Sequence, residues 1–127
     1  MKIKNLLLII SILALSNNVL ANKLDKPIKC PSVEAISQIS FDTVEPCKDS
    51  WTVKIINNKF DTDDNWEFIA FPIIAENKTQ ALEKAHEAMK SMENYDPEPT
   101  EIGDDKWLCG YASYATNTIG GAYTIQK

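Results

Sequence analysis

His86 is the only histidine of the chain, and it therefore limits the catalytic chemistry that the sequence supports. One histidine leaves a single base for a catalytic triad, and no serine or cysteine stands near it in the sequence. The chain also lacks a glycine-rich phosphate loop, an H-E-x-x-H motif and a C-x-x-C pair. Carboxylate catalysis stays open, but the acidic clusters at 61–64 and 98–105 have the composition of solvated loops. The sequence therefore predicts a protein that is not an enzyme.

A second interpretation of His86 is ligation of haem iron. Met89 follows it by three residues on a predicted helix, and histidine with methionine is a known pair of axial haem ligands. The same spacing arises on any amphipathic helix, where His86 falls just beyond the apolar arc. A half-exposed residue at the boundary of the apolar face is the simpler expectation.

Three cysteines, Cys30, Cys47 and Cys109, predict one disulfide and one free thiol in an oxidising compartment. In the chain-entropy model, a bridge from Cys30 to Cys109 stabilises by about 4–5 kcal/mol and one from Cys30 to Cys47 by about 3, so energy alone does not choose. Cys30 precedes a predicted helix and Cys109 lies in a predicted strand, whereas Cys47 follows Pro46 in a polar loop, so we favour Cys30 with Cys109. A zinc site of the three cysteines and His86 is the alternative, but no close C-x-x-C pair supports it.

Asp61, Asp63 and Asn65 stand at alternate positions and resemble the first half of a calcium-binding loop. The next residue is Trp66 where such a loop needs glycine, and Pro72 stands where it needs a closing glutamate. We therefore expect a solvated turn here, and no metal site in the chain.

The first 21 residues have the three parts of a secretory signal peptide. A short basic region is followed by an apolar run at 6–15 and by small residues that end at Ala21. The run has about half of the roughly 20 residues that span a bilayer, so cleavage is favoured over a membrane anchor. We expect a mature protein that begins at Asn22, has no transmembrane segment and is secreted or periplasmic.

The charge of the mature chain excludes two classes of partner. Loss of Lys2 and Lys4 with the signal peptide leaves 11 lysines against 18 acidic residues, a net charge of −7. The chain has no arginine, the side chain best suited to bidentate recognition of phosphate. Nucleic acid and anionic lipid surfaces are therefore poor candidate partners.

The longest apolar run outside the signal peptide, residues 65–75, predicts the central strand of the fold. It is rich in aromatic and β-branched residues, which favours a strand over a helix. Even-numbered residues from Trp66 to Ala70 point to one face, and odd-numbered residues from Ile69 to Ile73 point to the other. Both sets are apolar, so we expect both faces to be covered.

Two helices and further strands complete the predicted fold. Asn77 and Gln80 form a capping box for an amphipathic helix that meets no glycine or proline before Pro97. A shorter helix has Pro31 at its first position. Further strands are expected at 41–44, 50–56, 106–115 and 120–126. The sequence thus predicts an α+β fold in one domain, residues 22–127, with a single antiparallel sheet of four to five strands and both helices, one short and one longer, packed on one face.

Four short motifs follow the signal peptide in a fixed order. They are Cys30-Pro31-Ser32-Val33-x-Ala35-Ile36, Asn65-Trp66-x-Phe68, Ala81-x-x-Lys84-Ala85 and Trp107-x-Cys109-x-Tyr111. With these motifs the chain resembles a family of small exported proteins of unknown function from Legionella-type bacteria, some of which carry a hemin-binding label. The resemblance implies the pairing of Cys30 with Cys109, and Cys47 departs from the family's pattern. It also implies haem as a ligand, without indicating which residue would hold it.

We therefore expect an exported, non-enzymatic binding or interaction protein without a cofactor, whose partner is an unknown protein or small-molecule ligand. The alternative is a hemin-binding protein for iron acquisition, which the resemblance implies. His86, Tyr95, Tyr111 and Tyr114 are the residues to test as ligands of haem iron, and a single histidine excludes a bis-histidine site within one chain.

Overall fold

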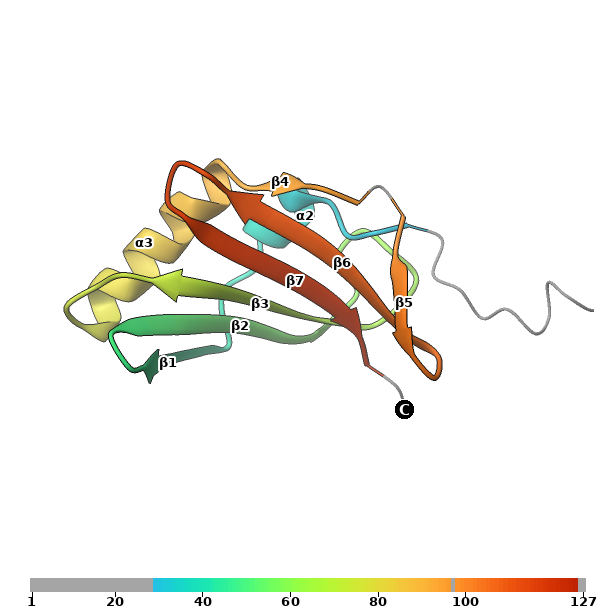
Figure 1. The fold of residues 1–127 in the computed structure, drawn as a ribbon, viewed down its shortest axis with the longest axis horizontal. Coiled ribbons are helices and arrows are strands. Elements are labelled where there is room, and N and C mark those ends of the chain that lie inside the picture. Colours follow the sequence, from blue (N-terminus) through green and yellow to red (C-terminus); the bar gives the residue numbers. More distant parts are fainter. Residues whose placement is uncertain (1–28, 97, 126–127) are drawn as a thin grey trace, which may run out of the picture.

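The computed structural model describes residues 29–96 and 98–125. The predicted signal peptide, residues 1–21, and the predicted start of the mature chain at Asn22 lie outside the described residues. Within these ranges seven strands form one antiparallel sheet, and two helices lie against one of its faces (Figure 1). The elements follow in the order α2 Val33–Ser37, β1 Thr43–Cys47, β2 Ser50–Asn58, β3 Trp66–Ile73, α3 Lys78–Lys90, β4 Glu93–Asn94, β5 Thr100–Gly103, β6 Lys106–Ser113 and β7 Thr118–Thr124.

β3 lies in the interior of the sheet, as its sequence predicts. The strand order is β1-β2-β3-β7-β6-β4, with β5 also paired to β6, and all of these pairs are antiparallel. β2 and β3 form one hairpin, and β6 and β7 form a second one that pairs with β3 through β7. The sheet therefore joins the early and the late halves of the chain along the β3–β7 pair.

The fold is mostly β, and the prediction of an α+β fold with four to five strands and a longer helix is wrong. The strands that sequence patterning missed, β4 and β5, have two and four residues. Such segments are too short for a period-two pattern, and they form because the outer edge of β6 offers unpaired backbone groups. β4 also limits the helix, since Glu93 and Asn94 pair with β6 and α3 ends at Lys90 after 13 residues.

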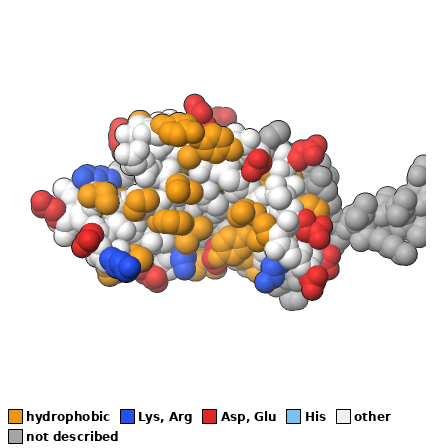
Figure 2. Space-filling view, in the orientation of Figure 1, with side chains coloured by type: hydrophobic (Ala, Val, Ile, Leu, Met, Phe, Trp, Pro, Cys, Tyr) orange, Lys and Arg blue, Asp and Glu red, His pale blue; other side chains and the backbone are white. Residues whose placement is uncertain are grey.

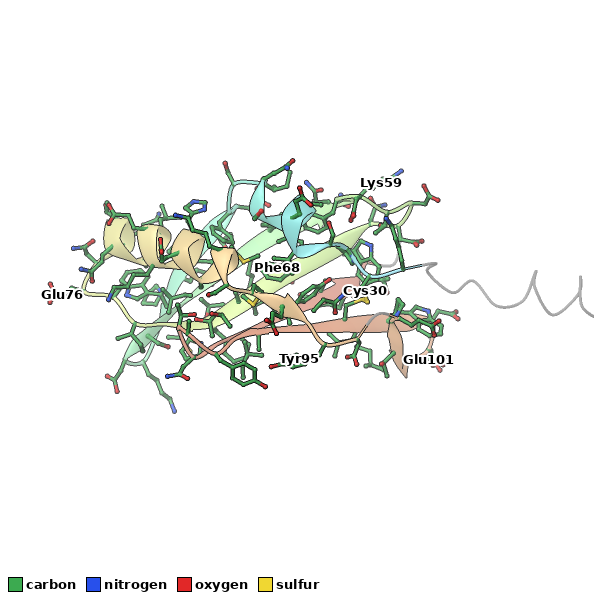
Figure 3. The ribbon with its side chains drawn as sticks, turned by 90° about the horizontal axis from the view of Figure 1, so that it is seen from above. Cys30, Lys59, Phe68, Glu76, Tyr95 and Glu101 are labelled. Atoms are coloured by element: carbon green, nitrogen blue, oxygen red, sulfur yellow. A yellow bond between two sulfur atoms is a disulfide. The ribbon has the colours of Figure 1, made fainter. Side chains whose placement is uncertain are left out.

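The helices cover only one face of the sheet. On β3, Trp66 and Phe68 face the helices and are fully buried, whereas Phe71 on the opposite face keeps 42% of its surface exposed. Figure 3 shows α2 and α3 on one side of the strands and Tyr95 on the other. The expectation that both faces of β3 are covered is therefore wrong, because both described helices pack on the same side.

Ile73 lies in the core although sequence alternation predicts it on the face of Phe71. The pairing of β2 with β3 shifts register between Trp51 and Val53, so that two residues of β2 oppose three of β3. Such a bulge reverses the side to which the following residues point. Ile73 is consequently 2% exposed and lies among the core residues.

The core is built around two aromatic side chains from neighbouring halves of the sheet. The rings of Phe68 and Tyr111 meet edge to face at 5.8 Å. A Cβ on Gly120, which lies between their strands, would come within 3.0 Å of the Phe68 ring and 3.3 Å of the Tyr111 Cβ, so a side chain there would require these neighbours to shift. Alanines at 81, 85 and 88 on the inner face of α3 are buried and let the helix approach the sheet closely.

Side-chain caps fix the start of both helices. Asn77 Oδ1 accepts the Gln80 N–H at 2.8 Å, and Gln80 Oε1 accepts the Glu76 N–H at 2.7 Å, which confirms the predicted cap of α3. Ser32 Oγ accepts the Ala35 N–H at 3.0 Å and caps α2. Pro31 precedes this cap, so it is not the first helical residue that the sequence suggested.

A disulfide joins Cys30 to Cys109, as predicted, and ties the segment before α2 to β6. Both residues are buried, at 5% and 0% exposure, and 79 positions separate them in the chain. Cys47 is free and exposed at the end of β1. The bridge therefore closes most of the described chain into one ring.

Replacing the bridged pair, Cys30→Ser with Cys109→Ser, is expected to lower the free energy of unfolding by about 2–5 kcal/mol, because the ring restricts the unfolded chain. Cys47→Ser is the matched control and is expected to change stability little, since its thiol is exposed. Urea unfolding of the three proteins measures both effects. A Cys47→Ser variant that unfolds as easily as the double variant, or a disulfide-linked peptide containing Cys47, would contradict the assignment.

Candidate functional site

The uncovered face of the sheet carries apolar side chains on three neighbouring strands. Phe71 of β3 lies opposite Ile119 of β7, and Ile119 lies opposite Ala112 of β6. Phe71 and Ile119 are 42% and 56% exposed. We call this surface the open face, and it comprises Ile69, Phe71, Tyr95, Leu108, Ala112, Tyr114, Ile119 and Tyr123. In a sheet with one solvated face, the residues that point to solvent are usually polar. An apolar set on that face is typical of a binding surface.

Two glycines lie opposite each other in the middle of the open face. Gly110 of β6 pairs with Gly121 of β7, and Gly121 also lies opposite Ile69. A Cβ on Gly121 would meet Leu108 at 3.5 Å, and one on Gly110 would meet the Asp96 carboxylate at 3.4 Å, both at or near ordinary contact distance. The fold itself therefore has room for side chains at both positions, and their absence leaves the centre of the face low and flat.

Two exposed tyrosines stand at one edge of the open face. Tyr95 and Tyr114 are 47% and 75% exposed, and their rings meet edge to face at 6.0 Å. The Tyr95 N–H donates to Gly110 O at 3.0 Å, which extends the pairing of β4 with β6. A hydrogen bond with Tyr114 raises the pKa of Tyr95 to about 12, with desolvation as the second cause.

Charged side chains border the open face, and acidic ones predominate. Glu67 lies opposite Tyr123, Glu93 lies opposite Ala112, and the Asp96 carboxylate lies near Gly110. Lysines at 54 and 106 are the basic residues on the same side of β2 and β6. Figure 2 shows this face with hydrophobic side chains across its middle and acidic ones mostly toward its edges.

The candidate haem ligands lie in separate parts of the described structure. His86 is on the outer side of α3, where its ring lies 5.1 Å from that of Phe41. Tyr111 is 1% exposed in the core, its phenol donates to Pro31 O, and burial raises the pKa of the phenol. Tyr95 is on the open face, on the other side of the sheet from α3. The fold brings Tyr95 next to Tyr114 but does not bring His86, Tyr95 and Tyr111 together.

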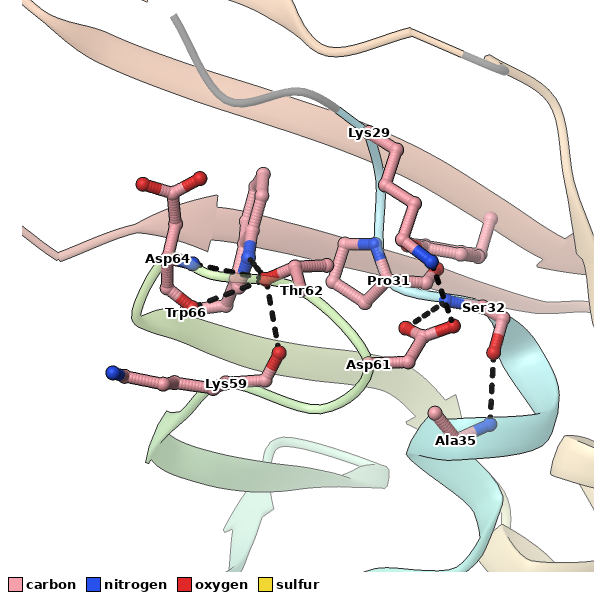
Figure 4. Close-up of polar contacts among 10 residues, drawn as sticks. Lys29, Pro31, Ser32, Ala35, Lys59, Asp61, Thr62, Asp64 and Trp66 are labelled. Carbon is pink, nitrogen blue, oxygen red and sulfur yellow. Dashed lines mark hydrogen bonds and ion pairs between the residues drawn. The ribbon is translucent and has the colours of Figure 1, made fainter. Parts of the chain in front are cut away.

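The loop with the calcium-like spacing orders the start of the described chain (Figure 4). Asp61 Oδ1 accepts the Ser32 N–H at 2.9 Å, and Asp61 Oδ2 lies 3.5 Å from Lys29 Nζ. In the same loop, Thr62 Oγ1 accepts the Trp66 indole N–H at 2.8 Å. Partial burial raises the pKa of Asp61, but the bonds from Ser32 and the charge of Lys29 outweigh it and lower the pKa below its ordinary value. Asp61 therefore pins the cap of α2 to the β2–β3 loop.

The described residues contain no group of three or more His, Cys, Asp or Glu side chains that could hold a metal ion. None of the helices described here is long and apolar enough to cross a membrane.

The family model described as a domain of unknown function (DUF4949) matches residues 29–127. No curated protein and no solved structure matches the chain.

Asp61→Asn is expected to lower the free energy of unfolding at pH 7 by less than about 1 kcal/mol, because the carboxylate is 35% exposed and screened by solvent. The folded pKa lies below the unfolded one, so the carboxylate stabilises above the ordinary aspartate pKa of about 4 and loses this effect as the pH falls through the folded value. The difference between wild type and Asp61→Asn should therefore shrink from pH 7 to pH 3 in urea unfolding. Asp61→Ala, which also removes the acceptor for Ser32, should cost more than Asp61→Asn at pH 7, and a difference independent of pH would contradict the role of the charge.

Proposed function

The chain belongs to the DUF4949 family, and we propose that it is an exported, non-enzymatic protein that binds another protein through the open face. The observation that carries the proposal is the apolar surface formed by Phe71, Ile119 and their neighbours on the uncovered side of the sheet. Single exposed apolar residues are common on protein surfaces, but a contiguous set across three strands is typical of an interaction site.

The paired glycines support close approach of a partner. Glycine weakens a strand, and within a sheet it often marks a place where another backbone comes near. Neither Gly110 nor Gly121 is required by its own neighbours, since an added Cβ would make contacts of 3.4 Å or longer. A partner that packs on the flat strip between Ile69 and Ile119 accounts for both positions.

Charge favours a basic partner over a second copy of the chain. The sequence has a net charge of −5, and acidic residues such as Glu67 and Glu93 border the open face. Two copies of an acidic face repel each other, whereas apolar residues flanked by lysine or arginine would complement it. We therefore propose a protein partner that presents an apolar patch with a basic rim.

Export supports the same proposal. The buried Cys30–Cys109 disulfide fits a secreted or periplasmic protein, because such bridges persist in oxidising compartments. The proposed signal peptide at residues 1–21 would bring the chain there. Its partner is then to be sought in the periplasm or outside the cell.

The proposal is tested by cross-linking and then by affinity. The protein is produced and exported in its native cells with a photo-cross-linking amino acid in place of Ile119, and it is expected to trap a discrete partner. The same amino acid in place of Glu83 on α3 is expected to trap none. The purified partner should then bind the unmodified protein, and Phe71→Ala and Ile119→Ala should each weaken binding about tenfold or more, because central apolar residues carry most of the energy of an interface. Higher salt should also weaken binding if the rim charges contribute.

Ile74→Ala is the matched control for Ile119→Ala. Ile74 is 61% exposed, similar to the 56% of Ile119, but it lies beside α3 and not on the open face. Equal losses of affinity in the two variants, or a partner with an acidic binding surface, would contradict the proposal.

Hemin binding is a second proposal, favoured by the exposed pair Tyr95 and Tyr114 beside an apolar face, because tyrosine is one of the residues that ligate haem iron. Hemin added to the protein is then expected to shift the Soret band with one-to-one stoichiometry. Tyr95→Phe and Tyr114→Phe should weaken the shift, and His86→Ala should leave it unchanged. Loss of the shift in His86→Ala would assign the iron to His86, and no shift in the wild type would exclude hemin binding.

A further inference from the structure

A pocket of about 320 Å³ opens on the helix side of the sheet, between α3 and the end of the sheet where β3 stops. Its lining comes from β3, α3 and the turn between β6 and β7. It consists of Pro72, Ile73, Ile74, Lys84, Glu87, Thr116 and Thr118. Figure 3 shows α3 lying over the strands at this end, near Glu76. Three segments distant in sequence thus build one concave site.

The end of β3 forms an apolar wall of the pocket, which extends from the core to the surface. Ile73 is 2% exposed and belongs to the core, whereas its neighbour Ile74 is 61% exposed at the mouth of the pocket. Covering such a side chain with an apolar group removes its surface from water and is favourable. This wall is therefore suited to the apolar part of a ligand.

The opposite wall contains Thr116 and Thr118. Their hydroxyl groups belong to a hydrogen-bonded row of four hydroxyls. Ser91 Oγ lies 2.6 Å from Ser113 Oγ, and Thr116 Oγ1 lies 2.9 Å from both Ser113 Oγ and Thr118 Oγ1. Thr118 Oγ1 also donates to Pro72 O at 3.5 Å. Because each hydroxyl carries a single proton, these bonds leave few donors for a ligand. Recognition of a polar head group then falls to the two charged side chains of the lining, Lys84 and Glu87.

Of these two, Lys84 of α3 makes no ion pair within the part of the chain that the structure describes, whereas the Glu87 carboxylate lies 3.3 Å from Lys90 Nζ. Charges more than about 8 Å away are largely screened at physiological salt, so the acidic character of the whole chain counts for less here than the nearby ammonium. Lys90 offsets the charge of Glu87, so the ammonium of Lys84 is the lining charge left to meet a ligand, and it favours an anion.

We propose that this pocket binds a small apolar monocarboxylate, with its tail between Pro72 and Ile74 and its carboxylate at Lys84 Nζ. The pocket volume of about 320 Å³ is at the lower end of the range for ligand pockets. If each non-hydrogen atom of a ligand takes about 30 Å³, the volume of one water molecule, the pocket holds about ten such atoms. Octanoate has this size and serves as the probe. The site is separate from the open face, because Ile73 and Thr118 point to the helix side of the sheet.

The test is titration of isotope-labelled, exported protein with octanoate, followed by amide chemical shifts. The amides near Ile74 and Thr116 are expected to shift, and octylamine is expected to bind more weakly. Lys84→Met should lower the affinity for octanoate about fivefold, the worth of one exposed charge pair of about 1 kcal/mol, and leave octan-1-ol binding unchanged. Lys78→Met, at the exposed start of the same helix, is the matched control and should change neither affinity.

Ile74→Asp is a second variant, chosen because the side chain is exposed and its replacement spares the core. It places a negative charge at the mouth and should abolish octanoate binding while the protein stays folded. The proposal is overturned if octanoate and octylamine bind equally, if Lys84→Met and Lys78→Met lose the same affinity, or if octanoate shifts only amides of the open face.

Discussion

One-sided cover of the sheet is the constraint from which the other features of this protein follow. The two described helices, of 5 and 13 residues, both lie on the same face of a seven-stranded sheet. Alternation along a strand sends every second side chain to the other face, where nothing in the described chain covers it. Phe71 and Ile119 are therefore exposed next to each other, although β3 and β7 are interior strands.

The covered face depends in turn on how the first described residues are held. The Cys30–Cys109 disulfide, the hydrogen bond from Tyr111 to Pro31 and the bonds of Asp61 to Ser32 act on three consecutive residues. They differ in kind, being a covalent bond, a buried neutral hydrogen bond and a partly exposed charged one. α2 has only five residues, too few for a stable isolated helix, so these anchors hold it against the sheet.

The two candidate binding surfaces differ in shape and charge because they lie on opposite faces. The open face is broad, flat at its glycines and bordered mostly by carboxylates, which suits a protein partner. The pocket beside α3 is small and concave, and its lining contains Lys84, which makes no ion pair in the described chain, and Glu87, which pairs with Lys90. A side chain on an interior strand belongs to one face only, so each surface can be changed by mutation without altering the other.

The sequence by itself determined the features that depend on neighbouring residues or on chemistry. The cap formed by Asn77, the interior position of β3 and the pairing of Cys30 with Cys109 were all predicted, because caps and apolar runs act over short distances and three cysteines leave few pairings. The burial of Ile73 and the short strands β4 and β5 were not predicted. A bulge and the pairing of a sheet edge depend on which strands lie next to each other, and the sequence does not show this.

The candidate sites show the same division. The residues of the open face and of the pocket are ordinary apolar, tyrosine, threonine and charged side chains, and none belongs to a chemical motif. Even the apolar alternation of β3 predicted cover on both faces, because a strand's pattern does not state how many helices will pack on it or on which side. Only the tertiary structure decided that Phe71 and Ile119 face solvent and that Tyr111 does not, since burial is set by what the rest of the chain can cover.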